Sequence, residues 1–288
     1  MNKFKCQVLG LLVVMFLGSV SLSFASVNGV TFDMGTEVSH FTYKEPGVME
    51  ETGALLGVYM DVILRQDKAN KGAESWQDLR GAFLANSMLA LESKLSLGQL
   101  SYTSTSTGTL DGIDELMLEL RGLGGVDLAV FDATRLTPYV GLGYRLLDDN
   151  TGGMISSTGH YGYDRESHYV YLPLGVKSMT DLNDQWQVGF DVEFDFFLFG
   201  KQQSHLEQVN ASLNTLKNDQ DSGYGVRGGL KFVRTSENYI LTFEPFVRFW
   251  DVDESNSGVV TCGGTPCASG YEPKNESIEY GLRVGTRF

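Results

Sequence analysis

The chain has 288 residues, of which 36 are acidic and 22 are basic, and its formal net charge is −14. Because phosphate binding requires a basic surface, this balance argues against nucleic acid as a partner. Aromatic residues make up 11% of the chain, and 34 glycines accompany only 6 prolines. This composition is typical of alternating strands rather than of a helical bundle.

The N-terminal segment predicts a secretory signal peptide. Two lysines precede an apolar run over residues 8–17, and small residues up to Ala25 form a cleavage site. We therefore expect residues 1–25 to be the signal peptide and residues 26–288 to form one barrel domain. A retained membrane helix is the weaker alternative, because the apolar run is short and no charged stop-transfer cluster follows it.

Downstream, apolar and polar side chains alternate with period two, as they do along a strand that separates two environments. The segment 186–200 carries Asp191, Glu193 and Asp195 on one face and only apolar residues on the other, which suits a barrel in lipid with a polar interior. The pattern predicts an all-β fold, a closed antiparallel transmembrane β-barrel of ten strands, with eight or twelve as alternatives. The expected strands are residues 31–43, 52–64, 84–101, 115–123, 137–146, 168–177, 186–200, 223–234, 239–251 and 277–288.

Two features make parts of this assignment weaker. Residues 84–101 fit helical spacing as well as strand alternation, and only the even strand count favours a strand. Pro173 and Pro245 fall inside expected strands, although proline has no N–H to donate to a strand ladder. We expect bulges or strand margins at these two positions.

The last strand is the clearest, because apolar residues occupy every second position up to the terminal aromatic residue. With the signal peptide and the other strands, it resembles the small outer-membrane β-barrel proteins of Gram-negative bacteria. In that family the barrel-assembly machinery reads a terminal aromatic residue and the alternate positions before it. The resemblance assigns this signal to Tyr280, Leu282, Val284 and Phe288, with Thr286 the least typical position. It also implies outer-membrane lipid and lipopolysaccharide as surroundings.

The connections alternate in length, with long ones at residues 148–167, 201–222 and 252–276. Outer-membrane barrels have long loops outside the cell and short periplasmic turns. The resemblance therefore implies a periplasmic C-terminus and extracellular long loops. The long polar connection at residues 66–81 is an exception, since it should be periplasmic.

The inward faces of the expected strands carry as many acids as bases. The acids are Glu37, Asp61, Glu92, Glu119, Asp191, Glu193, Asp195, Glu244 and Glu279. The bases are Lys94, Arg121, Arg145, Lys177, Arg227, Lys231, Arg248, Arg283 and Arg287. Balanced charges in a barrel of this size favour a narrow lumen filled by ion pairs, and a thin water-filled pore lined by the same groups is the alternative.

Cys262 and Cys267 are the two cysteines beyond the signal peptide. In an exported protein a local disulfide is the default expectation. A redox-active pair is the less favoured alternative, because the two-residue spacing that lowers a thiol pKa is absent.

No constellation typical of outer-membrane enzymes stands out. The ten-stranded omptin proteases combine an Asp-Asp pair with Asp-x-His, and no Asp-x-His occurs here; Asp148 and Asp149 are more simply a solvated loop start. Outer-membrane phospholipases place a histidine and a serine two residues apart, whereas Ser167 and His168 are adjacent. The histidines are scattered, and no metal or cofactor is expected.

The long loops are polar and carry tyrosines at positions 161, 163 and 271. Loops on a rigid scaffold are the usual place for recognition. We therefore expect a structural or surface-binding role, as of an adhesin or receptor, with an unknown extracellular ligand. A small diffusion channel is the second reading and an outer-membrane hydrolase the third.

Overall fold

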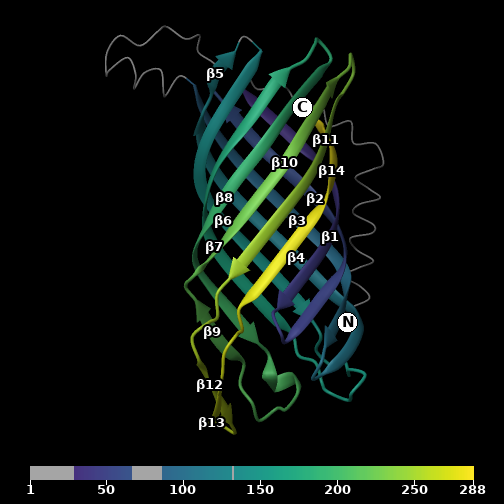
Figure 1. Cartoon of the computed structure of the whole chain (residues 1–288), viewed down its shortest axis with the longest axis vertical. Coiled ribbons are helices and arrows are strands. Elements are labelled where there is room, and N and C mark those ends of the chain that lie inside the picture. Colours follow the sequence, from purple (N-terminus) through teal and green to yellow (C-terminus); the bar gives the residue numbers. More distant parts are fainter. Residues whose placement is uncertain (1–28, 67–85, 132) are drawn as a thin grey trace, which may run out of the picture.

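The computed structural model describes residues 29–66, 86–131 and 133–288. Ten long strands, tilted against a common axis, form a barrel (Figure 1). They are β1 (Val30–Glu45), β2 (Met49–Arg65), β3 (Ser87–Ser104), β4 (Gly108–Val126), β6 (Thr134–Asn150), β7 (Arg165–Asp181), β8 (Trp186–Ser204), β10 (Gly223–Thr235), β11 (Ile240–Val252) and β14 (Asn275–Arg287). Within these ranges no helix is both long and apolar enough to cross a membrane.

Neighbouring strands of the barrel all pair antiparallel. The ring closes where β14 lies between β11 and β1 and where β8 pairs with β10. This confirms the ten-stranded antiparallel barrel. The ambiguous segment is a strand from Ser87 onward, because its leucines pair with the apolar face of β4.

Three expectations lie wholly or partly outside the described residues. The signal peptide over residues 1–25 does so entirely. Of the connection at residues 66–81, only Gln66 is described. Residues 84 and 85, at the start of the expected third strand, also lie outside the described residues.

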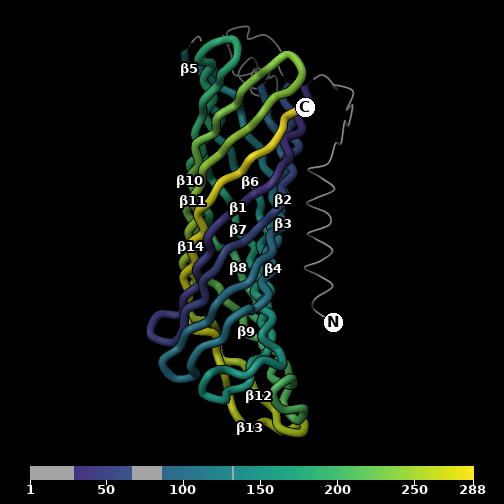
Figure 2. The backbone as a smooth tube through the Cα atoms, turned by 90° about the vertical axis from the view of Figure 1, so that its right-hand side faces the viewer, coloured from purple at the N-terminus to yellow at the C-terminus, as the bar shows by residue number. Residues whose placement is uncertain are grey.

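Several short elements extend the barrel. β5 (Leu128–Phe131) pairs with β6, β9 (Leu216–Gln220) pairs with β8, and a single 3-10 turn, η1 (Leu206–Gln208), lies between β8 and β9. β12 (Gly258–Cys262) and β13 (Thr265–Gly270) form a separate hairpin. Figures 1 and 2 show β9, β12 and β13 at the end of the barrel opposite to the C-terminus. These two ends are called the loop end and the C-terminal end below.

The outward and inward faces differ as the alternation predicts. Val192 and Tyr280 face outward with 56% and 51% of their surface exposed, whereas their neighbours Glu193 and Glu279 are each only 2% exposed. Apolar side chains therefore form a band around a charged interior. A barrel with this distribution is suited to hydrocarbon outside and polar contacts inside.

The alternation of inward and outward side chains in β8 changes at a position that the sequence alone does not indicate. The register between β7 and β8 shifts by one residue next to Val170 and Tyr171. Up to the bulge the alternation holds, and Phe197 faces inward and is buried; beyond the extra residue Leu198, Phe199 faces outward and is 59% exposed. A bulge adds one residue to one strand and so exchanges the faces beyond it.

The two strand prolines are accommodated in the same way. Pro173 lies in the middle of β7 and keeps its register with Asp195 of β8, and the ladder from β7 to β6 lacks the residue pairs of Leu172 and Pro173. Pro245 likewise lies in the middle of β11 and keeps an unbroken register with Leu282 of β14, so the expectation of a bulge or strand margin was wrong for both prolines. The ladder from β11 to β10 lacks the two residue pairs at this position. The missing N–H is therefore accommodated by a local loss of pairing and not by a bulge.

Inward tyrosines pack over glycines of the neighbouring strand. Tyr171 is the cross-strand partner of Gly143, and Tyr139 is the partner of Gly175. A Cβ atom at either glycine would overlap the tyrosine side chain. Glycine thus leaves room for the ring across the strand pair. The Tyr171 hydroxyl, placed in this way, donates a hydrogen bond of 2.6 Å to Glu119.

We expect Gly143→Ala to destabilise the barrel by about 1–3 kcal/mol, because the added methyl group displaces the Tyr171 ring from a packed interior. The urea midpoint of unfolding in detergent, read from gel mobility, measures the change. Gly122→Ala is the control, since a Cβ at Gly122 meets no atom within 4 Å. An equal midpoint for the two variants would contradict this role of Gly143.

Candidate functional site

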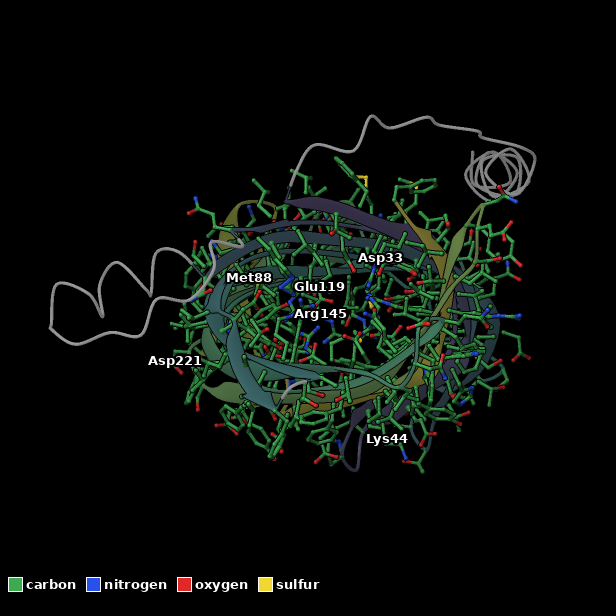
Figure 3. The ribbon with its side chains drawn as sticks, turned by 90° about the horizontal axis from the view of Figure 1, so that it is seen from above. Asp33, Lys44, Met88, Glu119, Arg145 and Asp221 are labelled. Atoms are coloured by element: carbon green, nitrogen blue, oxygen red, sulfur yellow. A yellow bond between two sulfur atoms is a disulfide. The ribbon has the colours of Figure 1, made fainter. Side chains whose placement is uncertain are left out.

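The structure places in the lumen every charged side chain that the sequence assigns to it. Viewed along the barrel axis, Glu119 and Arg145 lie inside the ring of strands, whereas Lys44 and Asp221 lie at its periphery (Figure 3). The assigned lumen residues are Asp61, Glu119, Arg121, Arg145, Lys177, Asp191, Glu193, Asp195, Arg227, Lys231, Glu244, Arg248, Glu279 and Arg283. Their contacts form connected groups across the barrel.

The first group surrounds Glu37 of β1, which has no exposed surface. Lys94 of β3 lies 3.4 Å from Glu37 and 2.8 Å from Glu279 of β14. Arg248 of β11 lies 3.0 Å from the same two carboxylates, and Arg283 lies 2.7 Å from Glu37. Five charged groups from four strands are therefore paired in one dry cluster, which we call the Glu37 cluster.

The second group surrounds Arg227 of β10. Its guanidinium lies 2.9 Å from Glu119, 2.8 Å from Glu193 and 2.9 Å from Asp195. Arg121 of β4 makes a further ion pair with Glu193. These contacts join β4 to β8 and β10 across the interior, so they close the lumen beside the Glu37 cluster.

A third group lies toward the C-terminal end. Asp33 of β1 has no exposed surface and pairs with Lys231 at 2.7 Å and with Arg287 at 3.1 Å. Lys231 also lies 3.4 Å from Glu244. The sequence analysis missed Asp33, because the alternation of the first strand is weak there. Asp33 and Glu37 are four residues apart and therefore lie on the same face of the strand. This spacing was the signal that Asp33 faces inward.

The remaining assigned residues have differing partners. Lys177 pairs with Glu92 and lies 3.8 Å from Asp191, and Asp61 lies 3.9 Å from Arg283. Arg145 departs from the expected charge network, since no ion pair found among the described residues includes it. It donates to the Ser277 hydroxyl at 3.3 Å and lies 5.5 Å from the centre of the Trp250 ring.

The loop half of the lumen is apolar, which the sequence analysis did not foresee. Phe41, Leu100, Met117, Tyr169 and Trp250 belong to one buried cluster in the interior. The positions of Leu100 and Met117 on inward registers were the signal for it. The lumen is thus filled by ion pairs in its middle and by packed apolar side chains toward the loop end.

At the loop end three carboxylates converge on Arg165. The guanidinium lies 2.8 Å from Glu45, 3.1 Å from Glu51 and 2.9 Å from Asp149. Asp149 is therefore buried and paired, and its interpretation as part of a solvated loop start was wrong. The chain returns at Arg165 from the long loop, so this cation meets acids of β1, β2 and β6.

A cavity of about 250 Å³ lies above Arg165, among the first three connections of the loop end. Tyr102, Tyr161 and Tyr163 line it, together with Glu45 and serine and threonine hydroxyls. Tyr161 is 61% exposed, so its ring is available to a ligand. Aromatic faces, hydroxyls and carboxylates around one hollow can hold a small polar ligand.

Cys262 and Cys267 form a disulfide with a Cα–Cα distance of 5.8 Å, as expected. They join β12 to β13, and the turn between these strands contains Gly263 and Gly264 with φ values of 58° and 84°. Left-handed backbone of this kind favours glycine. The disulfide therefore fixes the hairpin that projects furthest from the barrel (Figure 1).

The histidines are less scattered than expected. His168 and His205 lie 3.3 Å and 3.4 Å from the same carboxylate, that of Glu166, and His205 lies 2.9 Å from Glu207. Partial burial lowers the pKa of His205, but hydrogen bonds to the two glutamates raise it above its usual value. Among the described residues, no group of three or more histidine, cysteine or acidic side chains is placed to hold a metal ion.

We expect Lys94→Met to destabilise the barrel by about 3–5 kcal/mol, because it leaves the buried carboxylates of the Glu37 cluster with one cation fewer. The control is Lys44→Met, which breaks an exposed pair with Glu50 at 3.0 Å and should cost less than about 1 kcal/mol. Urea midpoints in detergent provide the measurement. Equal midpoints would show that the buried pairing contributes nothing.

Glu272, in the loop before β14, generates a prediction on pH. Burial raises its pKa from 4.5 to about 7, although Arg165 opposes the shift. Because the carboxyl pKa is raised in the folded protein, protonated Glu272 stabilises the folded loop. This stabilisation is fully present below pH 4.5 and is lost as the pH rises through about 7. Between pH 5.5 and pH 7.5 we expect amide protection near Glu272, corrected for intrinsic exchange, to fall on the order of tenfold.

Glu272→Gln is the matched variant for that measurement, because glutamine keeps the size of a protonated glutamate but does not titrate. Its protection should not change with pH. A decrease of the same size in both proteins would assign the effect to another group.

No family model and no curated protein matches the chain. Among solved structures, the outer membrane protease OmpT from Escherichia coli is similar, with a TM-score of 0.60 and 9% identity over 93% of this chain and 99% of that chain. The translocator domain of the autotransporter NalP from Neisseria meningitidis is also similar. The alignment covers 99% of this chain and 96% of that chain, with 13% identity and a TM-score of 0.42. The similarity to OmpT shows that the chain has the fold of an outer-membrane β-barrel.

Proposed function

We propose that this protein is a closed outer-membrane barrel that binds an extracellular ligand through its loop end. The loop end faces outward from the cell in this proposal, and the C-terminus lies in the periplasm. The apolar outer band and the connection lengths support this placement. The observation that carries the closed lumen is the burial of Lys94, 3% exposed, between Glu37 and Glu279.

Conduction requires water around the charged groups that line a pore. The carboxylates of Glu37, Glu193 and Asp195 are at most 2% exposed, and each meets a cation from another strand. Ions that crossed this section would have to break several such pairs at once. A closed lumen therefore accounts for the geometry better than a small diffusion channel does.

The loop-end cavity supports the binding role. Its lining offers tyrosine rings, hydroxyls and the carboxylate of Glu45 beside the cation of Arg165. Sugar hydroxyls donate to carboxylates, and sugar rings pack on aromatic faces, so a small glycan is the ligand class that we propose. A hydrolase has less support, since His168 and His205 both contact Glu166 and, among the described residues, neither makes a hydrogen bond to a serine hydroxyl.

We expect the refolded barrel to give no steady single-channel steps in a planar bilayer, because the buried ion pairs exclude water from the section that they cross. The matched variant is Glu37→Ala with Lys94→Ala, which removes one acid and one base from the Glu37 cluster and should allow intermittent steps. Steady steps from the unmodified barrel would overturn the closed lumen and favour the channel.

The binding role is tested with a printed glycan array and detergent-solubilised protein. We expect Tyr161→Ser to abolish binding, because Tyr161 lines the cavity. Tyr271→Ser should leave binding unchanged, since Tyr271 is similarly exposed at 54% but does not line the cavity. Binding by neither the parent protein nor the variants would contradict a glycan ligand, and an equal loss in both variants would contradict this location.

A further inference from the structure

A second cavity lies inside the barrel near the C-terminal end. It has a volume of about 210 Å³, and its lining contains nine basic residues and only four acidic ones. We call it the basal chamber. Arg65 is the last residue of β2, Arg287 is the last of β14, and Arg135 lies near the start of β6. These three arginines therefore surround the C-terminal mouth of the chamber.

The acids that neutralise these bases are recessed behind them. Asp127 is the carboxylate nearest to both Arg65, at 3.2 Å, and Arg135, at 3.9 Å. Asp33 is likewise shared by Lys231 and Arg287. Neither acid lines the chamber. The interior therefore presents cationic groups to a ligand. Each of these two recessed carboxylates pairs with two of the cationic groups.

Deeper in the chamber the arrangement repeats. Arg121 and Arg227 share Glu193, and Arg248 and Arg283 share Glu37. All four bases line the chamber and neither of these acids does, although Glu92, 3.0 Å from Arg121, and Asp61, 3.9 Å from Arg283, also belong to the lining.

Two donors on the chamber wall have no protein partner. The Nε atoms of Arg121 and Arg287 are buried and make no hydrogen bond, although both side chains line the chamber. Arg121 is 7% exposed. An unpaired buried donor costs about 1–3 kcal/mol, so an oxygen acceptor in the chamber would recover free energy if a shift of the arginine side chains brought these nitrogens into contact with it.

One acceptor on the same wall is also unpaired. The Oδ1 atom of Asp61 makes no hydrogen bond, and the residue is 5% exposed. A ligand that both accepts from arginine and donates to Asp61 would match these groups. A protonated oxyanion has this combination, whereas a fully deprotonated one offers acceptors alone.

The size of the chamber limits the ligand. A volume of 210 Å³ equals the liquid volume of about seven water molecules. This space suits a single small anion and excludes a peptide or a nucleotide. Toward the loop end, the Glu37 cluster closes the chamber, so among the residues that the structure describes it opens only toward the C-terminal end and is not a route through the barrel.

We propose that the basal chamber binds a small protonated oxyanion, namely free phosphate, that enters from the C-terminal end. The arginines of the mouth and Arg121 bind the oxygens of the anion, and the carboxylate of Asp61 accepts a hydrogen bond from its hydroxyl group. This site is separate from the loop-end cavity, and its existence does not depend on what the loops bind.

The test uses the full barrel in an uncharged detergent, titrated with inorganic phosphate at pH 7 and constant ionic strength, with phosphorus NMR line broadening as the readout. We expect saturable broadening that Arg65→Gln with Arg135→Gln weakens on the order of tenfold, because two charge-assisted contacts are lost. The control is Lys201→Gln, which lies outside the lumen with an exposed side chain and should have no effect. Folding of each variant is checked by gel mobility.

Two competitors define the ligand. Sulfate has the size and charge of phosphate but no proton at pH 7, so it should compete at least about tenfold more weakly if the Asp61 contact is used. Phosphatidylglycerol added to the micelle should not compete, because the chamber lies inside the ring of strands. Phosphate broadening that is absent, or that is equal in the mouth variant and the parent protein, would overturn the proposal, and competition by phosphatidylglycerol would assign the phosphate site to lipid on the outer surface.

Discussion

The carboxylate of Glu37 is completely buried and meets cations from three other strands, and much of the interior is arranged around this contact. A buried charge is tolerated only when partners compensate for its lost hydration. Lys94, Arg248 and Arg283 reach it only if β3, β11 and β14 stand in their observed registers. A slip of one residue in any of these strands would turn its cation toward lipid. The pairing therefore specifies register as well as filling space.

The architecture could be predicted from the sequence because a lipid exterior and a polar interior impose period two on every strand. Even the ambiguous third strand follows this rule from Ser87 onward. Inward charges such as Arg227 and Glu279 were assigned for the same reason. The bulge that turns Phe199 outward was not predictable, because it depends on how β7 and β8 pair. Asp33 was missed where the alternation is weak, although its face is that of Glu37.

The candidate sites were harder to predict than the strands. Which acid meets which base depends on the stagger of strands that are far apart in sequence, as with Arg121 and Glu193. Arg165 lies at the start of a strand, and nothing in its neighbourhood indicates that Glu45 and Glu51 will surround it. Local sequence gives the face of a side chain, whereas cavities arise from the closure of the whole ring.

The pairing of β1 with β14 has a consequence for how the chain matures. Glu37 and Asp33 belong to the first strand, whereas Arg283 and Arg287 belong to the last. During synthesis and export, these two carboxylates therefore lack the cations of β14 until the last strand arrives, although Lys94, Arg248 and Lys231 precede it in the chain. A prematurely terminated chain would retain hydrated anions on its opening strand and could not desolvate them. Full charge compensation of the first strand therefore requires the closing strand at the seam.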